Sequence, residues 1–143
     1  MLQKGLVYSL FAAVIWGCAP IFDKYAMQHL EPRIAIIVRN TIVFFATLPI
    51  LVVSFNDIRL EASQLTSKLV VVLGIAGILG GVIGLLLYTK ALKLMEASRV
   101  VPICSTYPLF AMIMAWIFLG EKLTLAKLGG TLMVILGIFL ISL

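Results

Sequence analysis

The chain has 143 residues, of which 63% are hydrophobic and 12% charged; its net charge is +5 and its mean hydropathy +1.20. A soluble domain carries roughly 25% charged residues, so this composition excludes a soluble enzyme. The 11 Lys and Arg residues are scattered one or two to a connection, without the basic stripe that indicates a nucleic-acid partner. In so apolar a chain they set membrane orientation and contact lipid headgroups.

Five stretches are apolar for roughly 20 residues each, which is the length of a helix that crosses a bilayer. They cover about Leu6–Tyr25, Ile34–Phe55, Leu69–Tyr88, Val101–Leu119 and Leu123–Leu143. No connection is long enough to separate domains. The sequence therefore predicts an all-α integral membrane protein, a single domain over residues 1–143 with five transmembrane helices. An odd number of spans places its two ends on opposite sides of the membrane.

Proline and glycine mark the expected helix ends. Pro32 can begin the second helix because its missing N–H is harmless in a first turn. Gly120 suits the position just after a helix, and the longest connection is expected from Asn56 to Lys68. The third span is expected to continue as an amphipathic helical segment through Thr89–Val100.

Glycines recur in the third span. Gly77 with Gly81, and Gly80 with Gly84, have the GxxxG spacing that lets transmembrane helices approach closely. The sequence therefore predicts a tightly packed helix face here; the alternative is a sliding interface that moves during transport.

Arg39 lies about two turns inside the second span, followed by Asn40. A central arginine costs about 2.5–3.5 kcal/mol on insertion scales and usually marks a pathway or cavity. Arg39 is expected either to line a water-filled cavity or to snorkel or pair structurally. Asp23 and Lys24 end the first span and, as sequence neighbours, do not share a helix face. They are either interfacial charges, or Lys24 turns inward toward a cavity entrance.

Trp16 lies near the middle of the first span, although tryptophan normally prefers the membrane interface. It is expected either to pack with a satisfied N–H or to face a polar cavity, where its ring can stack on a substrate. One turn later, Pro20 can kink the helix.

The fourth span contains Ser105, Thr106, Tyr107 and Pro108 in succession. Pro108 frees a backbone carbonyl one turn earlier, at Cys104, and hydroxyls or water can satisfy that carbonyl where a helix borders a cavity. The segment is therefore either a broken helix that binds substrate or a tolerated membrane proline.

The sequence indicates no chemical step: there is no catalytic triad, phosphate loop or histidine–acid cluster, and no catalytic, cofactor-binding or metal-binding residue is predicted. Cys18 and Cys104 lie in separate spans without zinc spacing. They are expected to be buried, reduced thiols.

Two groups of residues resemble the EamA-like domain of the drug/metabolite transporter superfamily. In the first half these are Trp16-Gly17, Lys24, Pro32 and Arg39; in the second half they are Ala91-Leu92-Lys93, Ala97-Ser98-Arg99-Val100, Pro102, Tyr107-Pro108, Phe118-Leu119-Gly120-Glu121-Lys122-Leu123-Thr124 and Gly129-Gly130. The resemblance implies one five-helix repeat in the inner membrane of a bacterium or archaeon. Most members of that family carry two such repeats in inverted topology and export amino acids or other small metabolites through a central cavity.

The basic residues are equally distributed between the two predicted sides of the membrane, apart from the deeper Arg39. One side has Lys4, Arg59, Lys68, Lys122 and Lys127, and the other has Lys24, Arg33, Lys90, Lys93 and Arg99. Orientation normally follows an excess of Lys and Arg on cytoplasmic loops. The balance predicts insertion in both orientations and an antiparallel homodimer that rebuilds an inverted repeat; a separately encoded five-helix partner is the alternative.

The preferred hypothesis is a secondary transporter that exports small metabolites such as amino acids. Lys24 and Arg39 would bind an anionic group, Trp16 and Tyr107 would stack on the substrate, and Ser105, close to Pro108, would offer a hydrogen bond. Three alternatives remain open: a proton/drug antiporter of the small-multidrug-resistance type, a sugar-lipid flippase subunit, and a non-transporting accessory subunit. The antiporter type uses a membrane acid in its first span, and Leu6–Phe22 contains none.

Overall fold

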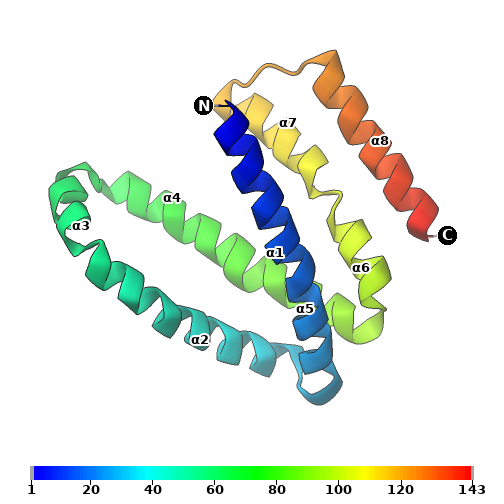
Figure 1. Cartoon of the computed structure of the whole chain (residues 1–143), viewed down its shortest axis with the longest axis horizontal. Coiled ribbons are helices and arrows are strands. Elements are labelled where there is room, and N and C mark those ends of the chain that lie inside the picture. Colours follow the sequence, from blue (N-terminus) through cyan, green and yellow to red (C-terminus); the bar gives the residue numbers. More distant parts are fainter. Residues whose placement is uncertain (1, 143) are drawn as a thin grey trace. The chain divides into compact units, whose positions relative to one another are not determined.

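The computed structural model describes the backbone of residues 2–142 and the side chains of residues 3–140, and the regular elements in this range are all helices (Figure 1). Four helical runs are long and apolar enough to cross a membrane: Gln3–His29, Pro32–Val53, Ser67–Leu94 and Ala97–Leu119. A fifth apolar helix, Leu125–Leu140, is shorter. The predicted all-α membrane fold is confirmed.

The chain divides into two compact units. Unit 1 contains Met1–Phe22 and Leu94–Leu143, and unit 2 contains Asp23–Lys93. The boundary falls within α1 (Leu2–His29), which continues through Pro20 without an interruption. Unit 2 therefore begins with the last two turns of α1.

Unit 2 continues with α2 (Pro32–Val53), which begins at Pro32 as the sequence predicts. The predicted connection Asn56–Lys68 is largely helical: α3 covers Phe55–Glu61 and the 3₁₀ turn η1 covers Ala62–Gln64. Asp57 in the first turn of α3 and Arg59 in its last turn complement the helix dipole, whereas Glu61 at its C-terminal end opposes it.

The third predicted span is one helical run with a wide turn in its middle. It consists of α4 (Ser67–Gly77), the π-helical η2 (Ile78–Gly84) and α5 (Leu85–Leu94). A Cβ atom on Gly84 would lie 2.8 Å from the carbonyl oxygen of Leu79, so the π turn requires glycine there. At Gly77, Gly80 and Gly81 a Cβ atom would meet nothing within 4 Å. Within the described chain these glycines are therefore not the tightly packed face that the GxxxG spacing predicts.

Unit 1 contains α1 up to Phe22 and three further helices, α6 (Ala97–Cys104), α7 (Tyr107–Leu119) and α8 (Leu125–Ser142). The amphipathic continuation predicted through Val100 is helical except at Met95 and Glu96, between α5 and α6. Gly120 ends α7 in the left-handed conformation, with φ 66°, as expected of a glycine just after a helix. Contacts between α6 and α8 hold this unit together, and Val100 of α6 is almost completely buried.

Candidate functional site

A cavity of about 610 Å³ lies in unit 1, between α1 and the segment that joins α6 to α7. Its lining residues are Ser9, Ala12, Ala13, Trp16, Gly17, Val101, Ser105 and Tyr107. The residues from α1 share one helix face because they recur at intervals of three and four. Small side chains on that face make room for the indole of Trp16, and the volume lies within the usual range for ligand pockets, roughly 300–1,000 Å³.

The far wall of the cavity is a break in the helix. Ser105 and Thr106 separate α6 from α7 and are not helical, and Figure 1 shows two coils joined by a short link. Pro108 stands in the first turn of α7, where its missing N–H costs nothing. The Ser105 hydroxyl donates to the carbonyl of Val101 at 2.8 Å, and the Thr106 hydroxyl donates to that of Ile103 at 2.9 Å.

A broken helix beside Pro108 was thus one of the two expected alternatives, but its hydroxyls are bonded differently from the expectation. They satisfy the carbonyls of Val101 and Ile103 rather than that of Cys104. Because Ser105 uses its hydroxyl hydrogen on Val101, its oxygen can still accept a hydrogen bond from a ligand in the cavity.

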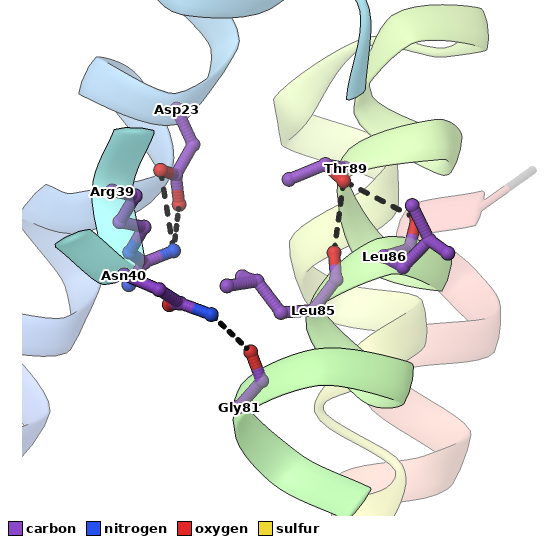
Figure 2. A network of polar contacts seen from close by, with 7 residues as sticks. All are labelled: Asp23, Arg39, Asn40, Gly81, Leu85, Leu86 and Thr89. Atoms are coloured by element: carbon purple, nitrogen blue, oxygen red, sulfur yellow. Dashed lines mark hydrogen bonds and ion pairs between the residues drawn. The ribbon is translucent and has the colours of Figure 1, made fainter. Parts of the chain in front are cut away.

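Unit 2 contains an ion pair between two helices. The Arg39 Nη1 of α2 lies 3.1 Å from Oδ2 and 3.3 Å from Oδ1 of Asp23 in α1 (Figure 2). The Asp23 side chain is 19% exposed and that of Arg39 is 41% exposed. A charge within a membrane-spanning segment is expensive unless it is paired, so each side chain makes the other tolerable.

The next residue on α2 attaches this helix to the π turn. Asn40 donates from Nδ2 to the carbonyl of Gly81 at 3.1 Å, and Figure 2 shows its amide reaching from α2 to η2. Wide turns expose backbone carbonyls that side chains can satisfy. Further along the same run, the buried Thr89 hydroxyl lies 2.9 Å from the Leu85 carbonyl and 3.2 Å from that of Leu86.

Lys24 and Lys93 form hydrogen bonds elsewhere in unit 2. The Lys24 ammonium donates to the carbonyl of Leu92, which is completely buried, at 2.6 Å. Lys93 donates to Oε1 of Glu31 at 2.6 Å and to the carbonyl of Leu30 at 3.2 Å, which joins α5 to the connection between α1 and α2. The hydrogen bond from Lys93, helped by its charge, lowers the pKa of the Glu31 carboxyl below its ordinary value.

The structure brings three of the six predicted substrate-binding residues together: Trp16, Ser105 and Tyr107 line one cavity. Pro108 follows Tyr107 at the start of α7 and is not among the lining residues. Lys24 and Arg39 belong to unit 2, where Arg39 has the structural pairing that was one of its two expected roles. The expected burial of the thiols was wrong, because both Cys18 and Cys104 are exposed on the chain, although both are free cysteines as expected.

Sequence reasoning underrated Asp23 and Asn40. Asp23 was expected to be an interfacial charge, and its separation of 16 residues from Arg39 gave no local signal of the pair. Asn40 adjoins Arg39 at membrane depth, and that position is itself a signal, since a polar amide in a span needs a partner.

Comparison with known proteins identifies the family. The sequence profile described as the EamA-like transporter family matches residues 3–143, which is nearly the whole chain. The chain belongs to the EamA-like transporter family. No solved structure matches it.

Named relatives of this EamA-like chain occur in bacteria and archaea. A "Probable amino-acid metabolite efflux pump" of Salmonella typhimurium is 28% identical over 96% of this chain, which covers 48% of the pump. An "Uncharacterized transporter" of Archaeoglobus fulgidus is 30% identical over 98% of the chain and 47% of the relative. An uncharacterized protein of Methanocaldococcus jannaschii is 30% identical, with 99% of this chain and 98% of the relative covered.

The chain thus spans about half the length of the efflux pump and of the archaeal transporter, and nearly all of the Methanocaldococcus protein. The family and its helices make the chain a multi-pass membrane protein. The names of these relatives point to small-molecule transport rather than to catalysis.

Proposed function

We propose that this chain is an EamA-like secondary transporter that exports small metabolites such as amino acids, and that the cavity at Trp16 binds the substrate. The observation that carries the proposal is the convergence of Trp16, Ser105 and Tyr107 on one cavity of about 610 Å³. Two aromatic rings offer stacking faces, and a hydroxyl oxygen at a helix break offers a polar contact. A cavity with this lining can bind a small solute, and none of these groups is arranged as a nucleophile with a base.

We further propose that two copies pair antiparallel, as a single five-helix repeat in dual topology. The equal distribution of basic residues over the two sides supports this arrangement.

An exporter of small metabolites fits unit 2 better than a drug antiporter does. A proton/drug antiporter needs a membrane acid whose charge is unpaired, so that it can balance the single charge of a cationic drug. Asp23 is paired with Arg39 at 3.1 Å, so its charge is already balanced. A neutral pair of this kind suits substrates that are themselves neutral overall.

The test is solute counterflow in liposomes that contain this chain alone, run with a panel of amino acids, organic acids, amines and lipophilic cations, with and without a pH gradient. We expect exchange of small metabolites by the wild-type chain. Trp16→Ala should lower it, whereas Trp116→Ala should not, because Trp116 of α7 is also exposed on the chain but does not line the cavity. Equal loss in both variants, or none in either, would contradict the role of the cavity; a wild-type chain that moves no solute would contradict the function.

A further inference from the structure

We propose that the Asp23–Arg39 pair recognises the zwitterionic head group of an amino-acid substrate, and that a proton competes with the substrate ammonium for Asp23. The inference rests on the proposed transport function and treats the pair as a binding site of its own within unit 2, separate from the Trp16 cavity. The two side chains contact one another through only part of their hydrogen-bonding groups, because Arg39 uses Nη1 alone.

The ion pair is made through a single nitrogen of the guanidinium. Arg39 Nη1 lies 3.1 and 3.3 Å from the two oxygens of Asp23. Neither Nη2 nor Nε donates a hydrogen bond to a described residue, so the edge formed by these two nitrogens keeps its parallel donors. Two parallel N–H donors are the arrangement that binds a carboxylate bidentately. A structural arginine that served only Asp23 would be expected to use that fork on Asp23 itself.

The acid has unused capacity as well. An ionised carboxylate offers about four lone-pair sites, and the hydrogen bonds from Arg39 occupy one direction on each oxygen of Asp23. An ammonium can therefore approach the carboxylate without displacing the guanidinium. The Arg39 side chain is 41% exposed and that of Asp23 is 19% exposed, so the rest of the chain does not enclose the pair completely.

Charge balance selects the ligand class. The pair is neutral overall, and a zwitterion adds one charge of each sign, so the occupied site contains alternating charges with a net charge of zero. An organic anion or an amine would leave one uncompensated charge within the membrane-spanning segments, which is costly in free energy. The geometry thus favours ligands with both an ammonium and a carboxylate over ligands with only one of them.

The same arrangement makes binding sensitive to protons. Arg39 of α2 is the charged group that contacts the Asp23 carboxylate, while its neighbour Lys24 donates to Leu92 of α5 and Lys93 of α5 donates to Glu31. A proton on Asp23 removes the acceptor for the substrate ammonium. Substrate affinity should therefore fall as the pH falls, which is the linkage that an exchanger of substrate for protons requires.

The test is equilibrium binding of labelled L-leucine, L-serine and L-phenylalanine to the purified chain, with competition by isoamylamine and isocaproate, which are leucine without its carboxylate and without its ammonium. Removing either charged group from the ligand should weaken binding by roughly tenfold or more. Asp23→Asn should lose the preference for leucine over isocaproate and the pH dependence. Arg39→Gln should lose the preference for leucine over isoamylamine.

Two further variants protect the test from misfolding. The double variant Asp23→Asn/Arg39→Gln leaves no unpaired charge, so it should fold and yet lose both preferences. Glu31→Gln makes the same acid-to-amide change in the exposed pair with Lys93 and should bind as the wild type does. Three results would overturn the inference. The first is an Asp23→Asn variant with unchanged ligand preferences and pH dependence, and the second is an analogue that binds as tightly as leucine. The third is that none of the three amino acids binds. Transport of other solutes by the same wild-type preparation would leave the proposed function standing in each case.

Discussion

At the scale of single residues, Trp16 decides whether the cavity is a binding site. Its side chain is 67% exposed and lines the cavity from α1. Removing the indole should raise the half-saturating substrate concentration roughly tenfold, because stacking and burial of an aromatic ring contribute about 1–2 kcal/mol. The measurement is initial counterflow rate against substrate concentration for Trp16→Ala and Trp116→Ala; a shift confined to Trp116→Ala would contradict this role.

Ser105 gives a second prediction at this scale. Ser105 lines the cavity and its hydroxyl donates to Val101, so its oxygen remains a hydrogen-bond acceptor; the hydroxyl of Thr106 donates to Ile103, and Thr106 is not among the lining residues. Ser105→Ala should therefore weaken the binding of substrates that carry a hydrogen-bond donor by about 1 kcal/mol. Thr106→Val is the matched control and should leave affinity unchanged. Identical affinities in Ser105→Ala and wild type across donor-bearing substrates would show that the oxygen makes no contact.

Single residues also show where sequence reasoning reaches its limit. The helix start at Pro32 and the helix end at Gly120 were predicted, and a break before Pro108 was one of two alternatives, because proline and glycine restrict the backbone locally. The pair of Asp23 with Arg39 could not be predicted, because it depends on how two helices meet rather than on any spacing along one of them. The exposed thiols were mispredicted for a related reason: an apolar span does not reveal which of its faces the chain itself covers.

At the scale of elements, glycines of the third span coincide with the π turn η2, but their spacing does not predict a π turn. Gly84 cannot carry a Cβ atom without meeting the Leu79 carbonyl at 2.8 Å. Gly84→Ala should lower the free energy of unfolding by about 1–3 kcal/mol, as overpacking does. Gly80→Ala, where a Cβ meets nothing within 4 Å, should be neutral or stabilising. Thermal melting in detergent compares the two, and equal melting temperatures would argue against the π turn.

Asn40 is the support for that turn from α2. Asn40→Ala removes its hydrogen bond to Gly81 and should cost about 1 kcal/mol. Amide hydrogen exchange in residues 78–86 should become faster, because the carbonyl of the wide turn loses its partner. Unchanged exchange there would mean that Asn40 does not hold the turn.

The contact of Lys93 in α5 with Glu31, between α1 and α2, should make the stability of the chain depend on pH. The folded-state pKa of Glu31 lies below its ordinary value of 4.5 because Lys93 bonds it. The stabilisation by this carboxylate is therefore present above the ordinary value and is lost as the pH falls through the lowered folded value. Glu31→Gln should lose stability at neutral pH and show less acid destabilisation than the wild type. The melting temperatures of both proteins are measured from neutral to acidic pH. An equal fall in the two proteins would show that the contact between Glu31 and Lys93 does not stabilise the fold.

At the scale of the whole molecule, the proposal is an antiparallel pair of copies. The membrane orientation can be fixed by removing basic residues from one side. Four suitable ones are exposed and make no side-chain bond in the described part of the chain, namely Lys4 and Lys68 on one predicted side and Lys90 and Arg99 on the other. Replacing either couple by glutamine leaves an excess of basic residues on the opposite side, which should then become cytoplasmic. Reporters fused to the C-terminus should be found on both sides for the wild type and on one side for each variant. A single location for every wild-type copy would exclude dual topology.

Counterflow in cells that express these two orientation-fixed variants singly and together shows whether transport needs two oppositely oriented copies. We expect little exchange with either variant alone and recovery to near the wild-type rate when both are present. Full exchange by one variant alone, or no recovery on co-expression of two folded variants, would contradict this expectation.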